Sequence, residues 1–232
     1  MNNRTIETTE VPWYRGPAFQ LLVVLMTVYL VGTFIGSDGL GIHLINLLLL
    51  VSLILGVRKI TDSPKVLKIA VIIVVVGFAG KIAGQALLGR EVVVWDFSIN
   101  LVFFATVLGF LIWAVAKAKR VNADTVFAAS GAFMLMGIVW AYAFMLVHAA
   151  NPAAFSLGPN DLAEPGSALL HYSFTTLTTV GYGSISPMSP VARTLSDLEA
   201  LIAQLYLAIV VARLVSLQIE HSRGYGGGKS EP

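Results

Sequence analysis

Residues 178–183 read TTVGYG, a polar and glycine-punctuated stretch that lies between two strongly apolar runs. Its backbone carbonyls and the Thr179 hydroxyl offer oxygen atoms that can replace the water shell of an ion. Gly181 and Gly183 can take backbone angles that a Cβ forbids, which lets successive carbonyl oxygens point to the same side. The types and spacing of these residues therefore predict a site where backbone oxygens ligate a desolvated cation.

The composition of the chain indicates where such a site would lie. Hydrophobic residues make up 56% of the 232 residues and charged residues only 12%, whereas charged residues are about 25% of a soluble domain. The chain is therefore predicted to be an integral membrane protein. It has no cysteine, which excludes disulfides, thiolate metal sites and cysteine nucleophiles. The basic residues are spread along the chain, so no nucleic-acid partner is expected.

Apolar, charge-poor windows predict the elements that carry this site, because a helix that crosses a bilayer needs about 20 mostly apolar residues. We expect an all-α membrane protein with six transmembrane helices, at residues 16–37, 39–57, 66–85, 97–116, 125–148 and 194–217. Charges inside the third and sixth windows lie near the helix ends, where long side chains can reach the headgroups. Membrane lipids are thus expected partners.

The distribution of lysine and arginine predicts the orientation, since short cytoplasmic loops collect these residues. Only Lys81, Arg90 and Arg193 fall on one side of the predicted membrane, and the other twelve fall on the opposite side. Both termini are therefore predicted to be cytoplasmic, in a multi-pass protein of the inner (plasma) membrane. Residues 149–193 then form one long connection on the outer side.

That outer connection contains residues 166–178, an apolar stretch of 13 residues without charge or proline. It is too short to cross a bilayer, so we predict a re-entrant pore helix. Non-helical backbone survives at membrane depth only where protein buries it or where it lines a water-filled cavity. The segment that follows, residues 180–183, is therefore predicted to return along a pore.

Thr179 to Gly183 reads TVGYG, which resembles the signature of potassium channels. Residues 171–217, with Pro187, Arg193 and the run LEALIAQLY at 198–206, are similar to the pore region of bacterial channels of that family. The resemblance implies K⁺ ligation at Thr179, Val180, Gly181 and Tyr182, with Gly183 completing the filter. Four copies of this loop are needed and the chain has one, so a homotetramer is expected.

The chain departs from many relatives of that family at three positions. Ser184 follows the filter where an acidic residue is common, and Thr175 stands where some relatives carry a carboxylate behind the filter. Ala203 occupies the place of a frequent hinge glycine in the inner helix, so a sharp bend there is less readily expected.

Residues expected to line the cavity below the filter are Thr178, Gln204, Leu207, Val211 and Val215. The last four recur at helical spacing and would share one face of the sixth helix. For Gln204 an interhelical hydrogen bond is the alternative to a position in the lumen.

Voltage sensing requires charges that move through the membrane field, and residues 97–116 carry none. Lys117, Lys119 and Arg120 follow this window and are explained by the orientation alone. We therefore predict a tetrameric potassium-selective channel that conducts K⁺ passively and lacks a conventional voltage sensor. The alternative is a voltage-dependent potassium channel with a non-standard sensor. No ligand-sensing domain is expected in the chain, so gating would come from its helices, lipid, tension, pH, ions or a separate regulatory partner.

Ionisable residues outside the motif have simpler expected roles. Glu199, just inside the sixth helix, is expected to tie that helix to the pore helix or to Arg193, with titratable gating as the alternative. His43, His148 and His171 have no second ligand at metal spacing, so helix packing or interfacial hydrogen bonding is expected for each.

The predicted organisation has four parts: a cytoplasmic segment at 1–18, a peripheral four-helix domain at 19–122, a pore domain at 123–217 and a flexible tail at 218–232. A secondary transporter would need an internal repeat, and residues 19–116 and 117–217 show no convincing one. An enzyme is not expected, because no HExxH, GxSxG or pair of intramembrane aspartates is present. No cofactor is expected apart from K⁺ as the permeant ligand.

Overall fold

The computed structural model describes residues 16–34, 91–118 and 121–226. The long helices are α1 (Pro17–Phe34), α4 (Glu91–Lys117), α5 (Ala123–Ala150) and α8 (Pro190–Gly226). Between α5 and α8 the chain forms η2 (Pro152–Ala154), β1 (Phe155–Ser156), α6 (Pro159–Ala163), α7 (Pro165–Leu177) and β2 (Ser186–Pro187). The described part of the chain is thus mostly helical.

Three helices in the described ranges are long and apolar enough to cross a membrane, over Val94–Lys117, Ala123–Ala150 and Pro190–Ile219. They correspond to the fourth, fifth and sixth predicted windows. The helix α1 occupies most of the first window. The second and third windows, with Lys68, Lys81 and His43, lie outside the described residues, so a total of six crossings stays a prediction.

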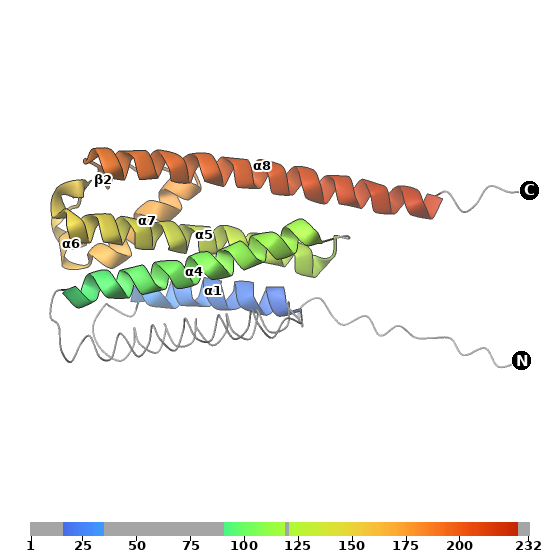
Figure 1. The fold of residues 1–232 in the computed structure, drawn as a ribbon, viewed down its shortest axis with the longest axis horizontal. Coiled ribbons are helices and arrows are strands. Elements are labelled where there is room, and N and C mark those ends of the chain that lie inside the picture. The colour runs from blue at the N-terminus through green and yellow to red at the C-terminus, as the bar shows by residue number, and fades with distance from the viewer. Residues whose placement is uncertain (1–15, 35–90, 119–120, 227–232) are drawn as a thin grey trace, which may run out of the picture.

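The helix α5 lies at the centre of the bundle and contacts α1, α4, α7 and α8. In Figure 1, α4 and α1 lie on one side of α5, while α8 lies on the other side with the tilted α7 between them. Small residues on α5, among them Ala132, Gly137 and Ala141, are buried and allow these neighbours to approach closely. The helix begins at Asn122, whose side chain accepts a hydrogen bond from the Thr125 amide at 2.8 Å and so caps the N-terminus.

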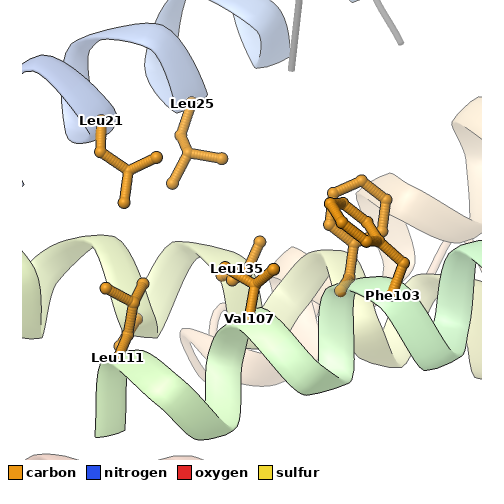
Figure 2. Close-up of a cluster of buried hydrophobic side chains, with 8 residues drawn as sticks. Leu21, Leu25, Phe103, Val107, Leu111 and Leu135 are labelled. Atoms are coloured by element: carbon orange, nitrogen blue, oxygen red, sulfur yellow. The ribbon is translucent and has the colours of Figure 1, made fainter. Parts of the chain in front are cut away.

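An apolar cluster joins α1, α4 and α5 (Figure 2). Leu21 and Leu25 of α1 project toward Val107 and Leu111 of α4, and Leu135 of α5 completes the contact. Burial of each such side chain contributes roughly 1.5–3 kcal/mol. The cluster consists of hydrocarbon side chains, so the face of α4 that meets its neighbours is apolar.

One end of the bundle is defined by polar contacts between helix termini. The Ala18 amide at the start of α1 donates to Asp124 Oδ1, at the start of α5, over 3.2 Å. At the same end Arg213 of α8 donates to the carbonyls of Ala116 and Ala118 at the C-terminus of α4. A cation there interacts favourably with the negative end of the helix dipole. The start of α1 and the Arg213 region of α8 therefore share one end of the bundle, and the membrane face at that end stays a prediction.

Tryptophans mark both ends of the apolar part of α4. Trp95 is 65% exposed and Trp113 is 53% exposed, and their separation of 18 residues corresponds to about 27 Å of helix. This matches a hydrocarbon core of about 30 Å, at whose boundaries tryptophans gather. Lys117 Nζ lies 5.7 Å from the centre of the Trp113 ring, as expected of a basic residue at the headgroup level.

The connection between α5 and α8 is folded rather than loose. The strands β1 and β2 pair antiparallel, with Phe155 opposite Pro187. Phe155 also makes edge-to-face contacts with Phe144 of α5 and Tyr172 of α7, with ring centroids 5.5 Å apart in both pairs. These contacts fix the start of the connection and the segment before α8 against the same part of α5.

The helix α8 is longer than the predicted sixth window and continues to Gly226. Residues 218–226, which were predicted to belong to a flexible tail, are part of this helix, and residues 227–232 lie outside the described residues, so a flexible tail stays a prediction. Residues 218–223 contain neither glycine nor proline, and adding residues to an existing helix is far easier than starting a new one.

Candidate functional site

The predicted pore helix, residues 166–178, corresponds to α7, which runs over Pro165–Leu177 and is capped by Thr178. Pro165 begins the helix, where its missing amide hydrogen is not needed. At the other end the Thr178 amide and hydroxyl both donate to the Phe174 carbonyl, at 3.0 and 2.6 Å. The Thr179 amide donates to the Thr176 carbonyl at 3.0 Å. The C-terminus of α7 therefore leads directly into residues 179–183.

The backbone of residues 179–183 alternates in conformation. Thr179, Gly181 and Gly183 have φ angles of +60°, +55° and +78°, and Thr179 is the one non-glycine residue with positive φ in the described part of the chain. Alternation of left- and right-handed backbone angles turns successive peptide groups to the same side, as it does in backbone anion nests. In this segment the alternation can therefore align successive carbonyl oxygens.

Thr179 is the strained member of this segment. A positive φ is unusual for any residue with a Cβ and exceptional for a β-branched one, and such a conformation costs of order 1–3 kcal/mol. It persists here because its neighbours are held: the Gly181 amide donates to the Thr175 carbonyl at 3.2 Å. Strain of this kind is concentrated at functional sites.

Tyr182 is held on the outside of the segment by a ring from α7. The His171 and Tyr182 rings stack with centroids 5.9 Å apart and an interplanar angle of 8°. The sequence predicted helix packing or interfacial hydrogen bonding for His171 and did not identify this partner. Eleven positions separate the two residues, so no local pattern could indicate the contact.

The segment is exposed in the single chain. All residues from 178 to 184 are exposed, including Val180 at 52% and Tyr182 at 73%. A Cβ added at Gly181 or Gly183 would meet nothing within 4 Å. One chain therefore surrounds only one side of these oxygen atoms.

The predicted cavity residues on α8 share an exposed face. Leu207, Val211 and Val215 are exposed to 40, 57 and 53%, and Gln204 is also exposed. Within the described part of the chain, Gln204 makes no interhelical hydrogen bond. Ala203, at the expected hinge position, is fully buried and clusters with Leu177 of α7 and Met136 of α5. Because Leu177 adjoins Thr178 and Ala203 adjoins Gln204, the base of the loop and Gln204 lie at the same level of α8.

Glu199 is joined to α7 and not to Arg193. Its Oε1 lies 2.5 Å from Ser173 Oγ, while Arg193 Nε donates to the Pro187 carbonyl at 3.2 Å. A second buried link between these helices runs from the Tyr172 hydroxyl to Ser196 Oγ at 2.7 Å. Burial raises the pKa of Tyr172, so its hydroxyl stays neutral and donates.

Sequence reasoning missed Ser173, Tyr172 and Ser196 as partners. The signal that could have identified two of them is that Tyr172 and Ser173 are polar side chains within the short apolar stretch that forms α7, where each would need a hydrogen-bond partner. No group of three or more histidine, aspartate and glutamate residues that could hold a metal ion occurs in the ranges described above. His148 Nδ1 is buried without a hydrogen-bond partner, and His43 lies outside those ranges.

Comparisons with known proteins bear on this region. Residues 143–219, from the end of α5 through α7, the loop and most of α8, match the model of a protein family described as "Ion channel". No curated protein and no solved structure matches the chain. Ion channels conduct passively and are not an enzyme class, and they are membrane-embedded and generally oligomeric. The match to residues 143–219 therefore supports an ion channel domain in this part of the chain.

Proposed function

We propose that the protein is a homotetrameric, potassium-selective channel in which residues 179–183 of four chains form the selectivity filter. The observation that carries this proposal is the alternating backbone, with positive φ at Thr179, Gly181 and Gly183, in an exposed loop at the end of a short helix. The match of residues 143–219 to an ion channel family supports passive conduction.

The chemistry of the loop favours a cation that gives up its water. Carbonyl oxygens of Thr179, Val180, Gly181 and Tyr182, with the Thr179 hydroxyl, would replace the hydration shell of K⁺. The C-terminus of α7 adds to this preference, because a helix C-terminus carries a partial negative charge of about half an electron. This end lies at the base of the loop, where an ion would shed water.

The unpartnered faces of one chain favour assembly of four. The filter segment is exposed on one side, and carbonyls from a single chain cannot encircle an ion. The helix α8 also has an exposed surface in the single chain. Its exposed large hydrophobic residues include Leu198, Leu201, Leu205, Ile209 and Ile219. In a symmetric tetramer this helix would contribute to subunit contacts and, through Gln204, Leu207, Val211 and Val215, to the cavity.

Voltage sensing by α4 is not part of the proposed function. The sequence of α4 from Phe97 to Ala116 carries no charge, and one of its faces packs into the apolar cluster with α1 and α5. The peripheral domain at 19–122 is therefore proposed to support the pore without a conventional sensor. A voltage-dependent channel with a non-standard sensor is the alternative, and it shares the same filter.

Gly181→Ala tests the filter. At φ +55° a Cβ strains the backbone even though the space beside it is open. This strain adds to the strain already present at Thr179, so the alternating carbonyl arrangement is disfavoured. We expect the variant to be produced and inserted but to lose K⁺ flux in liposomes made with the purified full-length protein.

Gly109→Ala is the matched control. Gly109 lies in α4, and an added Cβ there meets nothing within 4 Å, so flux and selectivity over Na⁺ should equal those of the parent protein. Undiminished K⁺-selective flux in Gly181→Ala would refute the proposed filter.

A further inference from the structure

Three helices meet at a buried chain of oxygen atoms. Ser173 Oγ of α7 lies 2.8 Å from the Gly137 carbonyl of α5 and 2.5 Å from Glu199 Oε1 of α8. Ser173 and Glu199 are both 0% exposed. The second carboxyl oxygen, Oε2, is buried and has no hydrogen-bond partner in the described structure.

Counting hydrogens identifies the protonation state that satisfies this chain. A serine hydroxyl has one hydrogen, and a backbone carbonyl can only accept. If Glu199 were ionised it could also only accept, and Ser173 would face two acceptors at hydrogen-bonding distance with one hydrogen. A protonated Glu199 resolves this, because it donates to Ser173 Oγ and Ser173 then donates to the Gly137 carbonyl.

Among the described residues, none offers Glu199 a compensating positive charge. Arg193 donates to the Pro187 carbonyl, and Arg213 lies about 21 Å further along α8, from a rise of about 1.5 Å per residue. A buried carboxylate without a paired cation is strongly disfavoured, whereas a neutral acid with one free carbonyl oxygen is far less so.

In the described part of the chain, the groups near Glu199 on α5, α7 and α8 also supply no positive charge. Tyr172 of α7 interacts electrostatically with Glu199 and donates to Ser196. On α8 itself, Asp197 carries a negative charge, and Tyr206, two turns further on, donates to the Ala129 carbonyl. From α5 the group at this junction is the Gly137 carbonyl, and the residues beside it in sequence, Met136 and Ile138, carry no ionisable group.

We propose that Glu199 is a positioning residue that is held as a neutral carboxylic acid and, through Ser173 and the Gly137 carbonyl, fastens α7 to α5 and α8. Its effect on conduction rests on the function proposed above, since α7 holds the loop through the bond from the Gly181 amide to the Thr175 carbonyl. Loss of the proton breaks the chain of donors and leaves an unpaired charge at the junction. The assembled protein therefore loses stability and K⁺ flux as pH rises, and it keeps both at lower pH.

Infrared spectroscopy of the purified protein in lipid tests the protonation directly. We expect the difference spectrum between the parent protein and Glu199→Gln at neutral pH to contain a protonated carboxyl band above the amide I region, which shifts in D₂O. If the difference contains only carboxylate bands, Glu199 is ionised and the inference is wrong. This measurement does not depend on conduction, so it also holds if the proposed channel function fails.

Variants separate the positioning role from a general loss of folding. Glu199→Gln keeps a neutral donor, so it should retain K⁺ flux and thermal stability and lose the decline at alkaline pH. Glu199→Ala removes the donor and leaves a cavity between α7 and α8, so we expect the K⁺ flux to fall about tenfold or more. The control is Asp197→Asn, an exposed carboxylate on the same helix, which should keep the alkaline decline.

Two results would overturn the inference: loss of flux and stability in Glu199→Gln equal to that in Glu199→Ala, or an unchanged alkaline decline in Glu199→Gln. Absence of K⁺ flux in the parent protein at every pH would instead reject the proposed channel and leave the infrared result to decide the state of Glu199.

Discussion

At the scale of single residues, the conformation of Thr179 is the least expected feature of the site. A β-branched residue at φ +60° is held against its own preference by the hydrogen bonds that tie the segment to α7. Gly181 and Gly183 adopt the same sign of φ without steric strain. The proposed filter would give the Thr179 side chain a role as the innermost oxygen ligand.

Thr179→Ala and Thr179→Ser test this role. Serine keeps the hydroxyl, so we expect K⁺-selective flux to persist, whereas alanine removes one oxygen ligand from each subunit and should weaken K⁺ binding at the innermost position. Both variants retain a Cβ, so backbone strain is matched between them. The measurement is block of K⁺ current by a competing ion in planar bilayers, and equal block in the two variants would argue against a ligand role for the hydroxyl.

At the scale of elements, α7 is held by three kinds of contact. The Tyr172 side chain packs in the cluster with Phe144 and Phe155. The hydroxyls of Tyr172 and Ser173 make hydrogen bonds with α8. The Phe174 ring lies directly against α5. A Cβ built at Gly137 would come within 3.1 Å of the Phe174 ring. Gly137 therefore sets how closely α7 approaches α5.

Gly137→Ala should displace α7 and destabilise the protein. Overpacking of this kind costs about 1–3 kcal/mol, which exceeds or offsets the gain of about 1 kcal/mol from replacing a helical glycine by alanine. Gly131→Ala on the same helix is the control, because its Cβ would meet only Leu25, at 4.0 Å. We expect the thermal midpoint in detergent to be lower for Gly137→Ala than for Gly131→Ala. Equal midpoints would show that Phe174 yields without cost.

At the scale of the whole molecule, α4 and α8 are connected at one end of the bundle by Arg213, which donates to the carbonyls of Ala116 and Ala118. The end of α4 is thereby attached to the helix that would line the cavity. Lys117 beside it lies over the Trp113 ring, which we expect to mark the boundary of the membrane. Little charge can then move through the membrane field when α4 is displaced. A charge that crosses the field fully contributes about 2.3 kcal/mol per 100 mV, so a small moved charge gives only a weak response to voltage.

Voltage dependence should therefore be shallow. We expect neutralising Lys117, Lys119 and Arg120 together to leave the slope of the open-probability curve unchanged in planar bilayers, while a change of permeant ion alters it. The parent protein recorded in the same lipid is the reference. A steep curve that flattens in the triple variant would favour the alternative of a non-standard voltage sensor.

Several features of the molecule follow from the sequence alone because they depend on local composition. Runs of apolar residues long enough to cross a bilayer predicted α4, α5 and most of α8, and a charge-free stretch too short to cross predicted α7. The sequence identified Gly181 and Gly183 as able to take backbone angles that a Cβ disfavours, and both have positive φ in the structure. Ligation of K⁺ and assembly into a tetramer remain predictions, since both need more than one chain.

Other features were decided only by the tertiary structure, because they join residues that no local pattern connects. Ser173 meets Gly137 and Glu199 across 36 and 26 positions of sequence, and Arg213 meets Ala118 across 95. Helix packing brings Ser173 and Glu199 together where water is excluded, and there a polar group must find a partner or lose its charge. The sequence could identify Glu199 as a carboxylate inside an apolar helix. Only the positions of α5 and α7 determined that its partner is a serine hydroxyl that already faces a backbone carbonyl.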